Sequence, residues 1–441
     1  MFPSLHRRPL PNGGGSVTRF IAIALALPLT LSAQAPPVLT LPQAQDLAVK
    51  NHPQIQAAQN EVNYANQQIV INRSAYYPNL TADVTGSQAN DLSRIGTGDL
   101  AASRLFDREA QGVTVRQLIT DSGRTGSLVA SSRYQAQAAA QNSQATRFTV
   151  LLDVNRAYFD VLHAQGVVKV AEQTVAARQL LDDQVTELAR NKLRSQVDVS
   201  FADVNVSEAK LLLLRAQGAV QGALAELGRA IGSDQPASYQ LSDQPLPPAP
   251  SSTPDALVAQ AIDNRPELAA LRASRDAARK FADAERDLSR PTVSAVAVGG
   301  YIPYINTSPL PPEYEAVAAN VSIPIFNGRL FSARREAAEQ RALEADQRLR
   351  DELQRISRDV RVAWAGANDA YQRIDVTAQF LRQATLALQL AQGRYDLSLA
   401  SIVELTQAQL NVTSAAIENL SAKYDYETQY AALQFALGLL R

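Results

Sequence analysis

The chain has 441 residues, no cysteine and a formal net charge of −1 at pH 7. A near-neutral balance argues against a nucleic-acid binder, and a chain without cysteine forms no disulfide. Its three histidines, His6, His52 and His163, lie far apart in sequence, and no glycine-rich phosphate loop is present. We therefore expect no metal site, no cofactor and no enzyme active site.

The N-terminus has the order of a secretory signal peptide. Basic residues up to Arg19 precede an apolar run from Phe20 to Leu31, and small residues around Ala33 follow. The apolar run is too short to span a membrane as a helix. We expect residues 1–33 to be the signal peptide of an exported protein.

An internal repeat dominates the rest of the sequence. Asn51-His52-Pro53 returns as Asn264-Arg265-Pro266, and similar residues follow both tripeptides at matching positions. A repeat of about 200 residues is too long for a solenoid and indicates one large pseudo-symmetric fold. We predict a first repeat at 34–232, a second at 254–441, and a proline-rich, extended linker at 233–253.

Each repeat contains two segments in which apolar and polar side chains alternate, as in half-buried strands. The predicted strands are Leu80–Val84, Val113–Ile119, Thr292–Tyr301 and Val317–Ile323. With their flanks they reach roughly 10 residues, the length of a tilted strand that crosses a bilayer. Tyrosines near the strand ends are predicted to form an aromatic girdle at the membrane surface: Tyr76, Tyr77, Tyr301, Tyr304 and Tyr314. A soluble sheet with tyrosines at its rim is the alternative at this point.

Long helices are predicted to follow the strands. Residues 124–190 contain no proline, and valines at 154, 161, 168 and 175 recur every seven residues. Apolar heptads indicate helices that supercoil against neighbours, and a helix of about 65 residues is roughly 100 Å long. The second repeat has the same pattern from Val360 to Tyr395. Short breaks at 191–197 and 396–401 precede returning helices, so each repeat is expected to end in a long helical hairpin.

Four strands cannot close a membrane barrel, because an open edge in lipid leaves backbone groups unpaired and closed barrels usually have at least eight strands. Three copies would supply twelve strands and a tube of long helices. The predicted fold is thus a mixed α and β membrane protein, in which each chain gives four transmembrane strands to a trimeric twelve-stranded barrel and long coiled-coil hairpins to an α-barrel. The alternative is a periplasmic coiled-coil adaptor or scaffold without a pore.

Several motifs, most of them doubled, resemble those of the TolC family of outer-membrane efflux proteins. They are the opening Leu39–Ala44 with Asn51-His52-Pro53, the strand starts at Pro78 and Pro291, the strand-to-helix joints Gln117–Arg124 and Pro324–Gly328, and the repeat ends Ala230–Gly232 and Ala436–Gly438. The resemblance implies a homotrimer in the outer membrane with a periplasmic helical tunnel. It implies a passive exit duct for efflux or type I secretion rather than an enzyme. The implied partners are a periplasmic adaptor (membrane fusion) protein, an inner-membrane pump of the RND, ABC or MFS type, and outer-membrane lipid, with no nucleic acid.

The same resemblance places a periplasmic gate at the turns of the helical hairpins. Asp198 and Glu404 match acidic residues of the family there, while Gln407 stands where a further aspartate is common, so any acidic ring should be weaker. Asp198 acting only as a helix cap is an equal alternative. The adaptor is expected to contact the tips at Asn191, Lys192, Arg194, Ser195, Ser398, Leu399 and Ser401. Lys192 and Ser398 stand where the family has glycine, and a left-handed turn there would be strained.

Overall fold

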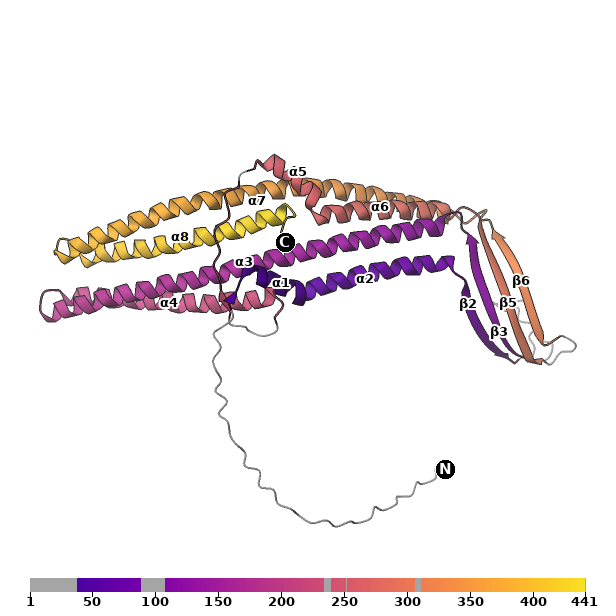
Figure 1. Ribbon diagram of the computed structural model, residues 1–441, viewed down its shortest axis with the longest axis horizontal. Coiled ribbons are helices and arrows are strands. Elements are labelled where there is room, and N and C mark those ends of the chain that lie inside the picture. The colour runs from indigo at the N-terminus through magenta and orange to yellow at the C-terminus, as the bar shows by residue number, and fades with distance from the viewer. Residues whose placement is uncertain (1–37, 89–107, 234–238, 251, 306–310, 441) are drawn as a thin grey trace, which may run out of the picture.

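The computed structural model describes residues 38–88, 108–233, 239–250, 252–305 and 311–440. The predicted signal peptide lies outside the described residues. The molecule is elongated: a four-stranded sheet forms one end, and long helices run side by side away from it (Figure 1). None of the described helices is both long enough and apolar enough to cross a membrane.

The described elements run in the same order twice. In the first half α1 (Leu41–Asn51), α2 (Pro53–Arg73), a 3-10 turn η1 (Ser74–Tyr76), β2 (Asn79–Ser87) and β3 (Arg108–Thr120) precede α3 (Arg124–Arg190) and α4 (Gln196–Ala230). In the second half the order is α5 (Pro254–Asn264), α6 (Pro266–Asp287), β5 (Thr292–Ile305), β6 (Glu313–Ser322), α7 (Leu330–Asp396) and α8 (Ile402–Ala436). The helices α3 and α7 both have 67 residues, and α4 and α8 both have 35.

The four strands form an antiparallel sheet in the order β2-β3-β5-β6. Its register separates the side chains by polarity. One face carries Leu80, Ala82, Val84, Val113, Val115, Val293, Ala295, Ala297, Val317, Ala319 and Val321. The other face carries Asn79, Thr81, Asp83, Thr85, Thr114, Arg116, Ser294, Asn320 and Ser322, interspersed with Leu118, Val296, Val298, Ala316 and Ala318. The predicted alternation is present, but β5 continues to Ile305, so the loop expected from residue 302 begins later.

Strand and helix are joined by two consecutive left-handed residues in each half. Ser122 and Gly123 have φ angles of 59° and 101°, and Gly328 and Arg329 have φ angles of 60° and 71°. In the first joint the Asp121 carboxylate accepts hydrogen bonds from the Thr125 amide and hydroxyl, both at 2.6 Å. These bonds satisfy part of the free N-terminal end of α3.

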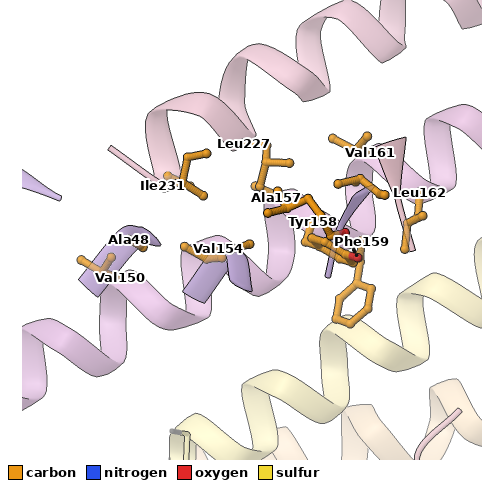
Figure 2. Packing of buried hydrophobic residues seen from close by; sticks show 14 of the residues in the cluster. Ala48, Val150, Val154, Ala157, Tyr158, Phe159, Val161, Leu162, Leu227 and Ile231 are labelled. Atoms are coloured by element: carbon orange, nitrogen blue, oxygen red, sulfur yellow. Dashed lines mark hydrogen bonds between the residues drawn. The ribbon is translucent and has the colours of Figure 1, made fainter. Parts of the chain in front are cut away.

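The helices pack as one curved layer. Away from the sheet the order is α4-α3-α8-α7, and nearer the sheet α2 and α6 take the places of α4 and α8 (Figure 1). At the level where α1 and α4 end, Val154, Tyr158, Leu227 and Ile231 form a fully buried cluster (Figure 2). The heptad pattern is the source of this core, because Val154 and Val161 are completely buried.

Part of the proline-rich linker lies across the helices as a strap. Its β4 (Gln240–Leu241) pairs in parallel with β1 (Val38–Leu39), and the Tyr158 hydroxyl donates to the carbonyls of Leu39 and Ser242 at 2.9 and 2.7 Å. On α8, Tyr426 donates to the Pro248 carbonyl at 2.6 Å. The strap therefore ties α3 to α8.

A carboxyl group lies buried beneath this strap. Glu427 is 2% exposed; one of its oxygens accepts a long hydrogen bond from Gln244 at 3.4 Å, and the other has no partner among the described residues. Burial raises the pKa of Glu427 to about 7, against the opposing effects of the Gln244 amide and of Lys423.

Candidate functional site

The hairpin turns lie together at the end of the molecule farthest from the sheet (Figure 1). In both turns, the residue that stands where the family has glycine is left-handed: Lys192 has a φ angle of 60° and Ser398 one of 59°. The Leu193 amide donates to the Leu188 carbonyl and the Leu399 amide to the Arg394 carbonyl, each at 2.8 Å. These bonds join residues five positions apart and close the helix ends. They satisfy helix-end carbonyls and offset the cost of about 1 kcal/mol for a left-handed residue with a side chain.

Both returning helices begin with a serine cap. The Asp198 amide donates to Ser195 Oγ at 3.2 Å, and the Ser195 amide donates to the Asp198 carboxylate at 3.2 Å. This reciprocal pair starts α4 at Gln196, two residues before the predicted start at Asp198. In the second turn the Glu404 amide donates to Ser401 Oγ at 3.3 Å. Asp198 therefore does cap its helix, and its charge remains beside the turn.

The two acidic residues have different partners. Glu404 accepts a hydrogen bond from Arg394 Nη1 at 2.7 Å, in an ion pair whose two side chains are largely exposed. Gln407, one turn further along α8, is exposed and donates to Asn411 at 3.0 Å. Part of the charge of Glu404 is thus balanced locally, whereas Asp198 is held by backbone and hydroxyl groups.

One arginine links the two hairpin turns of the chain. Arg194 Nη2 donates to the Tyr395 carbonyl at 2.9 Å, and its guanidinium carbon lies 4.3 Å from the centre of the Tyr395 ring. Tyr395 is 3% exposed, and burial raises its pKa, with Arg194 acting in the opposite sense. In the sequence, Tyr395 stands out only as the last residue of a heptad pattern. Its aromatic ring at that position was the one indication of a contact with a cation.

Beneath the turns a small apolar cluster joins all four helices. Its buried members are Leu181, Val185, Ala202, Ala391, Tyr395, Ile402, Leu405 and Ala408. Outside it, Leu193, Leu397 and Leu399 are 70%, 72% and 67% exposed. These exposed leucines lie at the tips where contact with the adaptor is predicted, and that contact stays a prediction.

The strand-end tyrosines divide between different environments. Tyr76 and Tyr77 are exposed just before β2, and Tyr301 lies on the apolar face of the sheet. Tyr314 lies on the polar face, where its ring covers Gly300 and Gly112 on the two neighbouring strands. Tyr304 of β5 pairs with Glu109 of β3, and its side chain lies outside the described part of the chain. The aromatic girdle of five tyrosines stays a prediction, with Tyr314 on the opposite face from Tyr301.

Comparison with known proteins agrees with this architecture. The family model described as "Outer membrane efflux protein" matches residues 44–233 and 257–439. Protein CyaE of Bordetella pertussis is 26% identical, over 98% of this chain and 93% of its own length, and the alkaline protease secretion protein AprF of Pseudomonas aeruginosa is 27% identical, over 89% and 83%. The CmeC outer membrane channel of Campylobacter jejuni has the same fold, with a TM-score of 0.79 at 17% identity over 90% of this chain and 85% of that one. The open MtrE outer membrane channel of Neisseria gonorrhoeae gives a TM-score of 0.75 at 20% identity over 90% and 89%.

Proposed function

Because the chain belongs to the outer membrane efflux protein family, whose members are outer-membrane exit ducts, we propose that three copies of it form one twelve-stranded barrel continuous with one helical tunnel. The observation that carries the proposal is the sheet. Its β2 and β6 strands are both unpaired at one edge, and its apolar face is exposed, with Leu80, Val84 and Val317 at 68%, 85% and 83%. In a bilayer those edges must be paired, and one chain with four strands cannot do this alone.

The helical layer supports the same association. Among the described elements, its outer helices α4 and α7 each have another long helix on one side only, and the short α5 also packs against α7. Along α7, Val362, Val376 and Leu390 are exposed at spacings of fourteen residues, and along α4 Phe201, Val204, Leu211 and Leu214 are exposed. A heptad stripe that no helix of the same chain covers is suited to a helix from a second copy. Each repeat, 34–232 and 254–441, would supply two strands and one hairpin.

The duct joins a larger export system. Residues 1–33 direct the chain through the inner membrane, the sheet lies in the outer membrane, and the helices extend about 100 Å into the periplasm. A periplasmic adaptor docks at the hairpin tips and connects the duct to an inner-membrane pump of the RND, ABC or MFS type. The names of the relatives, which include both secretion proteins and efflux pump components, support such a system but do not single out one cargo.

The hairpin turns form the periplasmic gate in this proposal. Asp198 and Glu404 give two carboxylates per chain, and six around the mouth of a trimer would attract cations and disfavour anions. Gln407 adds no charge at the next turn.

Conductance measurements test the duct and its gate. The purified protein is expected to run as a trimer in detergent and to form channels in planar bilayers that multivalent cations block from the tip side. Asp198→Asn with Glu404→Gln should weaken this block, because asparagine retains the helix cap while both charges are removed. A monomer without conductance refutes the duct, and unchanged block in the double variant refutes the acidic gate.

A further inference from the structure

The internal repeat provides a template for the contact between copies. The α3 and α7 helices start at equivalent residues, Arg124 and Leu330, after equivalent left-handed pairs. Counting back from those starts, Thr120 corresponds to Phe326 and Ile119 to Ile325. The strand starts also correspond, because Pro78 precedes β2 as Pro291 precedes β5.

The first of these joints is covered within the chain. Strand β3 pairs with β5, with Leu118 opposite Ser294 and Thr120 opposite Val293. Ser122 Oγ donates to the Pro291 carbonyl at 2.7 Å, and Arg290 Nη1 donates to the Ser122 carbonyl at 3.3 Å. The joint after β3 therefore lies against the start of β5 and is held there by polar groups.

The second joint has no such cover in the chain. It follows β6, the edge strand, and Ile325 and Phe326 are 95% and 88% exposed. Because Thr120 lies opposite Val293 at the start of β5, the equivalent partner of Phe326 is Leu80 at the start of β2, on the opposite edge of the sheet, and Leu80 is 68% exposed. Each chain thus carries two complementary apolar half-sites, one at each free edge.

In the proposed barrel, β6 of one copy pairs with β2 of the next. We propose that this pair takes the register of the β3–β5 pair, and that Phe326 packs there against Leu80 of the next copy. This inference rests on the proposed trimer and specifies its membrane seam. The partner is a second copy of this chain, because the two half-sites face the only two free edges of the described sheet and because the chain already contains the same junction once.

The transferred register is consistent with the faces of the sheet. Thr114 opposite Val298 becomes Asn320 opposite Thr85, and Arg116 opposite Val296 becomes Ser322 opposite Asp83, so polar residues meet on the polar face. Val115 opposite Ala297 becomes Val321 opposite Val84 on the apolar face. A slip by one residue would place Val321 opposite Asp83 or Thr85 instead of Val84, so the match of polarity across the seam selects this parity.

The change from polar to apolar residues at the joint has a physical reason. Within the chain, the β3 joint is held by chain connectivity and needs only satisfied hydrogen bonds. Between copies, association must offset lost translational and rotational freedom, and buried aromatic and aliphatic side chains at an interface supply most of that free energy. Phe326 in place of Thr120 meets this requirement.

Disulfide crosslinking tests the register, and the chain is suited to it because it has no cysteine of its own. Asn320→Cys with Thr85→Cys should give a ladder of disulfide-linked dimer and trimer on a non-reducing gel. The matched control is Asn320→Cys with Thr81→Cys, which uses the same face but a position about 13 Å away along the strand, beyond disulfide reach. Crosslinking in the control but not in the first pair, or in neither while light scattering shows a trimer, overturns the register.

The aromatic contact needs a separate variant. Phe326→Ser should lower the temperature at which the trimer dissociates in mild detergent, whereas Phe326→Leu, which keeps an apolar side chain, should retain most of the wild-type value. Equal behaviour of the two variants overturns the contact. A wild-type protein that is monomeric in light scattering contradicts the proposed trimer itself, so failure of the assembly and failure of the seam give different results.

Discussion

A single methyl group at Gly232 should destabilise the helical body. Gly232 follows α4 with φ +69°, and a Cβ placed there would lie 2.9 Å from backbone atoms of Asn51 and His52. A left-handed residue with a side chain costs about 1–2 kcal/mol, and overpacking against backbone adds about 1–3 kcal/mol. Gly232→Ala is therefore expected to lower the free energy of unfolding by about 2–5 kcal/mol.

Gly228 provides the control within the same helix. It is helical, and a Cβ there would have no described atom of another element within 4 Å. Gly228→Ala should stabilise by about 0.5–1 kcal/mol, because alanine favours the helix. Thermal scans of helical circular dichroism in one detergent would compare both variants with wild type. Equal midpoints for the two variants would falsify the close packing of Gly232 against the turn between α1 and α2.

Three further variants test the strap and the tips. Glu427→Gln should remove a pH dependence of stability, because the pKa of Glu427 is about 7 in the folded protein against an ordinary value of 4.5. The wild type carries no penalty below pH 4.5, its free energy of unfolding falls by about 1–3 kcal/mol as the pH rises to 7, and it is constant above. The variant should therefore be the more stable protein at pH 8, and parallel pH profiles of the two would contradict this. Arg194→Ala removes the hydrogen bond and the ring contact to Tyr395, which together contribute about 1–2 kcal/mol to stability. It should speed amide hydrogen exchange around the second turn by roughly tenfold, and an unchanged exchange rate would refute the contact. Leu399→Asp should reduce crosslinking to the adaptor, whereas Leu343→Asp, 55% exposed near the sheet end of α7, should not. Equal crosslinking in both would remove the tip from the contact.

The elements that repeat a simple period were predictable from the sequence. The first long helix, residues 124–190, and the alternating strands follow from heptads and from the two-residue period, because each period determines which side chains share a face. The capping alternative for Asp198 was visible in the spacing of Ser195 and Asp198, which suits a reciprocal cap.

Contacts between segments distant in sequence were not predictable in the same way. Nothing local indicates that Arg194 reaches Tyr395, that Tyr158 holds the linker, or that Glu427 is buried beneath it. Each depends on how the two repeats are placed beside each other, and a single sequence carries no direct signal of that distance. The predicted end of β5 at Tyr301 was also wrong, because Tyr304 and Ile305 pair with β3 again beyond an irregularity at Ile302 and Pro303.

Equivalent positions of the two repeats carry different residues at both ends of the molecule. Near the sheet, the seam within the chain is polar and the free half-sites are apolar, with Phe326 at the position equivalent to Thr120. At the tips, the seam within the chain carries the contact of Arg194 with Tyr395, but the equivalent residues are Ala400 in the second repeat and Ala189 in the first, which can form neither the hydrogen bond nor the ring contact. In the proposed trimer, the contact between copies at the tips therefore lacks this arginine–tyrosine pair and depends on exposed apolar residues of α4 and α7, such as Phe201 and Leu390.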